Sequence, residues 1–353
     1  MNQDLSSLIA HGATTLPLVE VRSYNVEIED EDGFVGDRAS KSAFRNLIDD
    51  WRKVVRKAGE DPLGDKDIDE ISNKKLDLLL SEGDPEAAGI IHGAIEDFAQ
   101  QFAAVIRRFL KLKYWRETQR IVVGGGLRAS RVGELIIGRA TVLLKAEQAT
   151  VDLVPIHNHP DDAALIGAVH LMPRWMFKGH DAILAVDIGG SKIRAGVVML
   201  NLKKNVEVPA PSVWRADFWK YSEEKKISRD DAVQGLVDMV KALIDQAEKE
   251  KLMLAPFIGI GCPGRIAADG TIESGAQNLP GNWESQKFNL ARSIRDLIPA
   301  IGEHETAVVM HNDAVIQGLS EVSFMSDVEY WSILTIGTGL GNAQFVNRQE
   351  KPA

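Results

Sequence analysis

The stretch Ile183–Val198 reads ILAVDIGGSKIRAGVV and decides the fold class. An apolar run leads to Asp187, two glycines follow at Gly189 and Gly190, and the chain continues with β-branched and apolar residues. This pattern predicts two strands joined by a tight turn, and not a strand followed by a helix. Glycines in such a turn allow several backbone N–H groups to converge on one anion.

Two other glycine-rich segments follow apolar strands. Ile333–Val346 reads ILTIGTGLGNAQFV and again predicts two strands joined by a turn, about 150 residues after the first. Gly124–Gly126 instead precedes a predicted helix. Neither strand-joining turn is a Walker loop, because the pattern G-x-x-x-x-G-K-[ST] and the helix that follows it are both absent. Gly259–Gly264 spells G-x-G-x-x-G, but a turn signal follows where a dinucleotide-binding fold needs a helix.

Length and composition exclude several classes of protein. The 353 residues are enough for two domains, and the formal net charge of −10 argues against nucleic acid or anionic membrane as a partner. Cys262 is the only cysteine, which excludes an intrachain disulfide and a structural zinc site that needs two cysteines. Because the sequence shows no membrane-length apolar run and no secretory leader pattern, we expect a cytoplasmic protein.

Strands alternate with helices along the chain, which indicates an α/β architecture. An amphipathic helix begins at Pro85, with apolar residues at alternating steps of three and four. Asp313 follows the apolar strand Ala307–Met310 and lies where a helix begins, so it would project from the carboxyl end of a strand, where ligands bind in open α/β sheets. A helix N-cap is the alternative role for this aspartate.

Five motifs together resemble those of the ROK (repressor, open reading frame, kinase) family of sugar kinases, within the superfamily of actin, hexokinase and the heat-shock ATPases. The resemblance implies a two-lobed actin-like ATPase fold of the ribonuclease-H type, with ATP and Mg²⁺ as cofactors and a sugar as substrate. The motifs are Asp187–Lys192 and Gly337–Gly339 for phosphate, Gly124–Gly126 for adenosine, Gly261–Gly264 with Asn278–Trp283 for the sugar, and Asn312–Ala314 for catalysis.

The resemblance also implies roles for single residues. Asp313 would be the general base of a glucokinase-like phosphoryl transfer, and Asp187 would hold hydrated Mg²⁺. The sugar would contact Gly264, Asn278 and Asn312, whose amides can donate and accept; capping and turn roles are the alternatives for both asparagines. ATP would contact Asp187, Gly189, Gly190, Ser191, Lys192, Gly337, Thr338, Gly339, Gly124, Gly125 and Gly126.

The order of the motifs differs from that of the family, since the adenosine motif comes first in this chain. The sequence therefore predicts a circular permutant in which a linker near Phe177–His180 joins the family's old termini, and Ala353 lies near the first strand. Residues 156–312 would form a smaller sugar-side lobe with the first phosphate motif. Residues 313–353 together with 1–155 would form a larger nucleotide-side lobe.

Several features depart from the family or suit other functions. The Glu-x-Gly-His element and the zinc cluster that many members carry are not visible; Asp32–Arg38 lies at roughly that place and is either a substitute or a surface loop. His157–Asp162 resembles a metal-hydrolase string, but a helix start explains it as well. A sugar-responsive transcriptional regulator and a catalytically reduced ATP- or sugar-binding protein are the alternative functions. The regulator would need a DNA-reading helix-turn-helix, and the only candidate region, residues 40–80, has mixed charges and no convincing recognition helix. A homodimer is left open.

Overall fold

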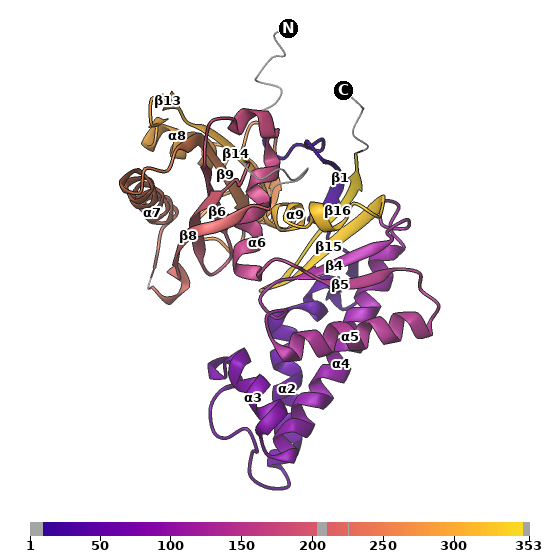
Figure 1. Ribbon diagram of the computed structural model, residues 1–353. Coiled ribbons are helices and arrows are strands. Elements are labelled where there is room, and N and C mark those ends of the chain that lie inside the picture. The colour runs from indigo at the N-terminus through magenta and orange to yellow at the C-terminus, as the bar shows by residue number, and fades with distance from the viewer. Residues whose placement is uncertain (1–9, 203–209, 225, 349–353) are drawn as a thin grey trace. The chain divides into compact units, whose positions relative to one another are not determined.

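The computed structural model describes residues 10–202, 210–224 and 226–348 (Figure 1). Strands and helices alternate along these residues, as the sequence predicts. The strands form two five-stranded sheets and three small two-stranded ones. The chain is therefore built around two similar sheets.

The first sheet has the order β14-β9-β6-β7-β8. Strands β6 (Ala182–Ile188), β7 (Ile193–Met199) and β8 (Ser212–Trp219) pair antiparallel in that sequence, which confirms the predicted hairpin around Gly189 and Gly190. Strands β9 (Leu254–Cys262) and β14 (Ala307–Asn312) continue the sheet on the other side of β6, both in parallel pairings. The G-x-G-x-x-G string thus belongs to the end of β9, with no helix directly after it.

The second sheet has the order β1-β16-β15-β4-β5. Its strands are β1 (Val19–Tyr24), β16 (Leu340–Asn347), β15 (Tyr330–Ile336), β4 (Arg120–Gly124) and β5 (Asp152–Pro155). Strand β4 pairs parallel with both β15 and β5. The predicted hairpin turn at Gly337–Gly339 joins the neighbouring strands β15 and β16.

Both sheets share one arrangement of strands. In each sheet a hairpin joins the central strand to a second strand, and a third strand pairs with the outer edge of the second. Two strands that run parallel to the central strand lie on its other side. This is the ribonuclease-H type of sheet, present twice as in actin-like ATPases, so the predicted fold class is confirmed. In the second sheet the outermost strand beside the hairpin is β1, near the start of the chain, whereas β15 and β16 lie near its end.

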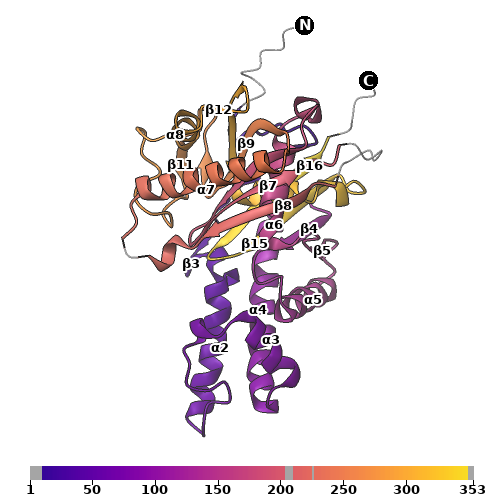
Figure 2. The ribbon, with the colours of Figure 1, turned by 60° about the vertical axis from the view of Figure 1, so that its left-hand side comes forward.

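The helices begin where the sequence places capping residues. Helix α4 (Pro85–Leu110) has Pro85 in its first turn and Asp84 as N-cap, whose side chain accepts a hydrogen bond from the Glu86 N–H. Helix α2 lies beside α4 in two views (Figures 1 and 2). The other helices are α2 (Lys41–Arg56), α3 (Asn73–Glu82), α5 (Arg131–Ala146), α6 (Pro160–Gly167), α7 (Arg229–Lys249), α8 (Leu290–Leu297) and α9 (Asp313–Leu319).

Short elements complete the chain. The acidic run near Gly33 forms the hairpin of β2 (Glu29–Asp30) and β3 (Gly33–Phe34), followed by the 3-10 helix η1 (Val35–Ala39). Hairpins β10 (Arg265–Ile266) with β11 (Ile272–Ser274) and β12 (Ala300–Ile301) with β13 (His304–Glu305) follow later. The other 3-10 helices are η2 (Ile68–Glu70), η3 (Ala168–Leu171), η4 (Arg174–Phe177), η5 (Tyr221–Glu223) and η6 (Val322–Phe324).

The chain divides into two compact units. Unit 1 comprises Asp161–Glu329 together with the described residues up to Asn25 and from Phe345 onward. Unit 2 comprises Val26–Pro160 and Tyr330–Gln344. In this division residues 10–25, 313–329 and 345–348 belong to unit 1, whereas the motifs predict them in the nucleotide-side lobe; the two lobes stay a prediction.

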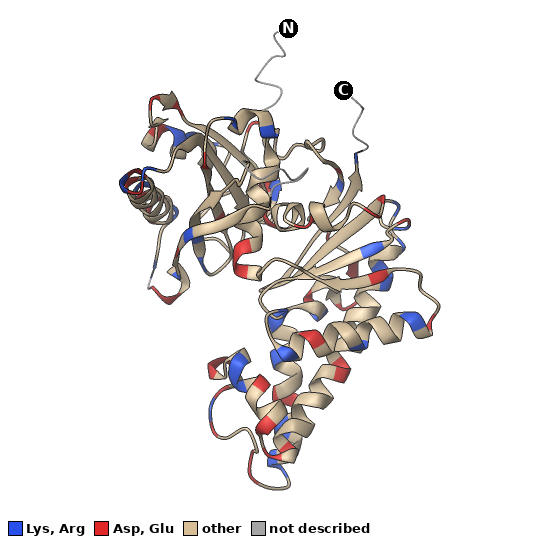
Figure 3. Ribbon diagram, in the orientation of Figure 1, with Lys and Arg blue, Asp and Glu red and all other residues tan. Residues whose placement is uncertain are grey.

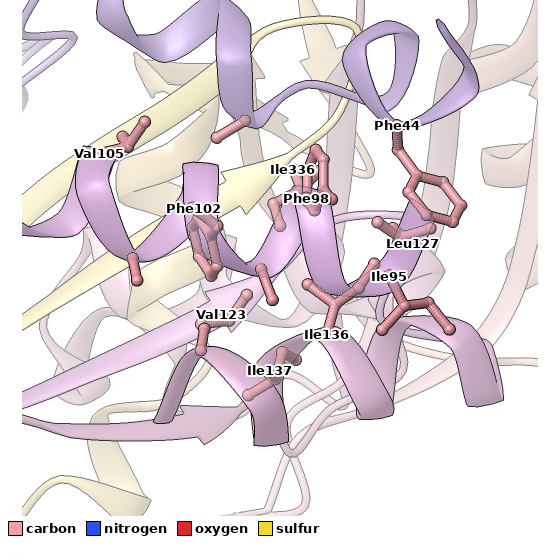
Figure 4. Close-up of a cluster of buried hydrophobic side chains, with 14 of the residues drawn as sticks. Phe44, Ile95, Phe98, Phe102, Val105, Val123, Leu127, Ile136, Ile137 and Ile336 are labelled. Atoms are coloured by element: carbon pink, nitrogen blue, oxygen red, sulfur yellow. The ribbon is translucent and has the colours of Figure 1, made fainter. Parts of the chain in front are cut away.

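Each unit has its own hydrophobic core. In unit 2, Phe98 and Phe102 of α4 lie in one core cluster with Ile136 of α5 and Ile336 of β15 (Figure 4). In unit 1, α7 and α8 cover the sheet around Val186 and Ile260. The apolar residues of the helix that begins at Pro85 are thus part of this core. Burying one large apolar side chain fully contributes roughly 1.5–3 kcal/mol.

Residues 41–82 do not form a helix-turn-helix. Helices α2 and α3 are separated by residues 57–72, whereas a helix-turn-helix needs a turn of three or four residues.

In the part of the chain that the structure describes, no helix is long and apolar enough to cross a membrane.

Candidate functional site

The first glycine turn, residues 189–192, is held in shape by its own backbone and by one tyrosine. The Gly189 N–H donates to the Lys192 carbonyl over 2.9 Å, and the buried Tyr221 hydroxyl donates to the Gly189 carbonyl over 2.6 Å. No acceptor within the described residues takes the N–H groups of Gly190 and Ser191. A fixed turn with two unused amide donors is suited to bind an anion.

Asp187 lies at the end of β6, directly across the hairpin from Arg194. Arg194 Nη1 donates to Asp187 Oδ2 over 3.2 Å, and Nη2 pairs with the Asp161 carboxylate at the start of α6. Lys192 Nζ lies 3.4 Å from the same Asp161 oxygen. Asp187 and Arg194 keep only 13% and 11% of their side-chain surface exposed, so this pair is fixed and largely desolvated.

Gly261 separates Asp187 from Asp313. It pairs with Asp187 in the sheet, and a Cβ built on it would lie 3.6 Å from Asp187 Oδ1 and 3.7 Å from the Asp313 Cα. Asp313 is the first residue of α9, and its N-cap is Asn312. The N-cap role considered for Asp313 is therefore filled by its neighbour, which leaves the Asp313 carboxylate for other chemistry.

The two carboxylates influence one another. Burial, and then the charge of Asp313, raise the pKa of Asp187 to about 7. Burial also raises the pKa of Asp313. The buried Cys262 thiol beside them has its pKa raised by burial and then by Asp313 and Asp187. Two acids whose charges repel in a buried site favour binding of a proton or a cation between them.

The residues predicted to bind the sugar differ in whether their side-chain amides already make hydrogen bonds within the protein. Asn312 is buried and fully engaged: its Oδ1 accepts from the N–H groups of Ala314 and Val315, and its Nδ2 donates to the Gly264 carbonyl over 3.1 Å. This is the capping alternative for Asn312. Asn278 is exposed, and its Cβ lies 3.2 Å from where a Cβ on Gly190 would be, so it lies against the first turn.

Gly264 has a conformation that only glycine adopts readily. Its φ is +97°, and a Cβ there would lie 2.3 Å from the Ser274 carbonyl oxygen. Trp283 of the neighbouring loop is buried, donates from Nε1 to the Pro280 carbonyl over 2.8 Å and meets Phe288 edge to face. Trp283 therefore packs beneath the loop.

In unit 2 the second turn and the predicted adenosine motif lie side by side. The Gly337 N–H donates to the Gly339 carbonyl over 3.0 Å, and the Gly337 carbonyl accepts from the Lys41 N–H over 2.9 Å. Thr338 and Gly339 are exposed. Gly125, with φ +91°, approaches the residue before this turn so closely that a Cβ would lie 2.2 Å from the Ile336 carbonyl oxygen.

The predicted residues therefore form two groups. Within unit 1 the structure brings together Asp187, Gly189, Gly190, Ser191, Lys192, Gly264, Asn278, Asn312 and Asp313. Within unit 2 it brings together Gly124, Gly125, Gly126, Gly337, Thr338 and Gly339. In the described residues no group of three His, Cys, Asp or Glu side chains is arranged to hold a metal ion, at His157–Asp162 or elsewhere.

Sequence reasoning missed three contributors to the first group. Arg194 could have been found, because a four-residue turn in a hairpin places it opposite Asp187. Asp161 was noted as a helix-start carboxylate, but its contact with Arg194 spans 33 residues of sequence. Tyr221 comes from η5 after the edge strand, and no local pattern connects it to Gly189.

Two ribonuclease-H-type sheets with a glycine hairpin in each define the fold of the actin-like ATPases. Residues 183–350 match the model of the ROK family, which is the family that the motifs resemble. No curated protein matches the chain in sequence.

Solved structures with partial similarity include three kinases. A Listeria monocytogenes protein named as a candidate N-acetylmannosamine kinase is 26% identical, with 47% of each chain covered and a TM-score of 0.33. A ROK hexokinase from Thermus thermophilus is 22% identical over 46% of this chain and 45% of its own, with a TM-score of 0.29. An inorganic polyphosphate/ATP-glucomannokinase from an Arthrobacter species is 18% identical over 48% and 62%, with a TM-score of 0.31. The chain thus spans about half the length of the first two.

Proposed function

We propose that the protein phosphorylates a hydroxyl group of a hexose-like sugar with ATP. The observation that carries the proposal is the pair of buried carboxylates, Asp187 and Asp313, on either side of Gly261 and next to an anion-binding glycine turn. Phosphoryl transfer to an alcohol needs donors for the phosphate oxygens and a carboxylate that accepts the hydroxyl proton.

Asp313 is the proton acceptor in this proposal. It begins α9 with its N-cap requirement met by Asn312, and burial raises its pKa toward the range in which a carboxylate works as a base. Asn278, exposed against the first turn, offers an amide to the sugar hydroxyls. Asn312 holds Gly264 and the start of α9 in place, and so supports the sugar site through its backbone contacts.

The residues present fit Mg²⁺ and ATP. Asp187 supplies a buried carboxylate oxygen, and Mg²⁺ at phosphate sites takes one or two protein carboxylates and several waters. When bound, the ion would neutralise phosphate charge. Arg194 orients the Asp187 carboxylate, while the amides of Gly190 and Ser191 would receive phosphate oxygens. Within unit 2, the second turn at Gly337–Gly339 and the segment Gly124–Gly126 are the glycine segments that we propose for ATP.

The proposal is tested by measuring ADP release over a panel of hexoses and amino sugars with Mg²⁺ and ATP. We expect one class of sugar to accelerate ADP release above the sugar-free rate. The Gly190→Val variant should bind ATP at least roughly tenfold more weakly, because a branched side chain would press on Asn278 and shield the turn amides. Unchanged ATP affinity in this variant, or no sugar-dependent ADP release in the parent protein, contradicts the proposal.

We also propose that the chain is a circular permutant of the family's usual order. The Arg348 N–H donates to the Leu18 carbonyl over 3.0 Å, so the last described residues lie against the first strand region; Ala353 itself lies outside the described residues. A chain with residues 353 and 1 joined by a short linker and reopened at Lys178 should keep its melting temperature within a few degrees. Failure of that chain to fold, while a chain with the same linker inserted at Gly33 folds, argues against the permutation.

A further inference from the structure

A cavity away from the glycine turns is lined by several positively charged residues. In unit 2, a cavity of about 320 Å³ lies between η1 and the last turns of α4. Residues of both charges alternate along the helices of unit 2 (Figure 3). The lining of this cavity instead has four cationic residues, Arg38, Arg107, Arg108 and Lys111, and one carboxylate, Asp30.

The ion pairs around the cavity leave positive charge over. Asp30 is shared by Arg38 and by Arg108, whose Nη2 lies 3.2 Å from Asp30 Oδ2. Arg107 pairs with Glu147 outside the cavity over 2.7 Å. Lys111 makes no ion pair with a carboxylate in the described part of the chain. Arg38 also lies 3.4 Å from the exposed carboxylate of Asp32. Three carboxylates, Asp30, Asp32 and Glu147, thus pair with the three arginines, which leaves Lys111 as the one lining cation without an ion pair in the described residues.

The remaining lining suits a small organic molecule. Val35, Ala104 and Val105 supply apolar surface, and Gln101 supplies an amide. The volume is at the lower end of the range for ligand sites, which is roughly 300–1,000 Å³. The carboxyl end of α4 explains why basic residues gather there, through its negative dipole, but it does not require them to surround an open cavity.

We propose that this cavity binds a small phosphate monoester, with Lys111 and Arg108 on its phosphate and the apolar surface against its carbon skeleton. Such a group carries about −1.5 to −2 charge at neutral pH, which the unpaired charge of Lys111 would neutralise in part. Arginine and lysine bind phosphate by charge-assisted hydrogen bonds. The site is separate from the proposed nucleotide turns, although η1 connects them: Gly36 packs against Leu340, and Ser40, which ends η1, precedes the Lys41 N–H that donates to the Gly337 carbonyl.

The test is isothermal titration calorimetry at low ionic strength with glycerol 3-phosphate, inorganic phosphate and glycerol as probes. We expect both phosphates to bind and glycerol not to bind, with tighter binding of glycerol 3-phosphate if the apolar lining contributes. Lys111→Gln should weaken phosphate binding at least roughly tenfold, the usual effect of losing one hydrogen bond to a charged group. It removes no ion pair of Asp30, so the fold of η1 is kept.

Two control variants distinguish binding in this cavity from binding at the first glycine turn and from a general effect of surface charge. Lys74→Gln removes one exposed charge from α3 of the same unit and should change the affinity less than twofold. Gly190→Val, which damages the proposed nucleotide turn, should also leave phosphate binding here unchanged. No binding of either phosphate at millimolar concentration, or equal binding by Lys111→Gln and the parent protein, overturns the proposal. Loss of binding in Gly190→Val would assign the phosphate to the first turn instead.

Discussion

Asp313→Asn should slow sugar-dependent turnover roughly 10²–10⁴-fold, the contribution of a general base in proton transfer. The amide keeps the size of the carboxylate and its place at the first position of α9. It also removes a buried negative charge near Asp187, so ATP binding should be retained and the fold should not suffer. The measurement is steady-state ADP release together with ATP titration of the same variant.

Asp296→Asn is the matched control, because Asp296 is an exposed aspartate on α8 of the same unit. It should leave turnover within twofold of the parent. If Asp313→Asn turns over as fast as the control, Asp313 is not the base and the proposed mechanism is wrong. If ATP binding falls together with turnover, Asp313 acts in nucleotide binding and not in proton transfer.

The pH dependence gives an independent readout of the same residue. Burial raises the pKa of Asp313, and the carboxylate must be ionised to accept a proton. Turnover should therefore rise with pH as Asp313 loses its proton, and the rise should be absent from the residual activity of Asp313→Asn. A rising limb that persists unchanged in the variant would belong to another group, of which Asp187 is the nearest.

Hairpins were the part of this fold that sequence could predict well. At Gly189 and at Gly337 a short glycine turn joins two apolar strands, and so short a turn makes the two strands pair with each other. The local sequence is therefore enough to predict each hairpin. The edge strand β8 (Ser212–Trp219) was missed, because most of its side chains are exposed and it lacks the alternation of a half-buried strand. Its strand conformation depends on pairing with β7, which the local sequence does not reveal.

The candidate site shows the same limit in side-chain chemistry. The sequence predicted that Asp187 and Asp313 each lie at the end of an apolar strand, but it placed them in different lobes. Their proximity follows from the strand order of one sheet, in which β9 lies between β6 and β14. The sequence did not reveal that the Asn312 side chain uses its NH₂ group to bond Gly264 and its oxygen to cap α9, because Gly264 lies 48 residues away. Buried polar groups must be satisfied, and the partner that satisfies them is a property of tertiary structure.

Gly125→Ala should destabilise the protein by about 3 kcal/mol, from the cost of a positive φ in an L-residue and of overpacking against backbone. Gly125 has φ +91°, and its new Cβ would lie 2.2 Å from the Ile336 oxygen and 2.6 Å from the Ile336 nitrogen. Since both contacts are backbone atoms of β15, no side chain can rotate away. We expect the melting temperature to fall by roughly 6–12 °C, measured by circular dichroism.

The neighbouring glycine provides the control for this prediction. A Cβ on Gly126 meets no atom within 4 Å, so Gly126→Ala should change the free energy of unfolding by no more than about 0.5 kcal/mol. Equal melting temperatures for the two variants would mean that β4 and β15 do not approach as described. Because Ile336 directly precedes the Gly337–Gly339 turn, displacement of β15 by the new Cβ should also weaken ATP binding in Gly125→Ala. Gly126→Ala therefore separates the effect of close packing from the effect of a side chain near the nucleotide.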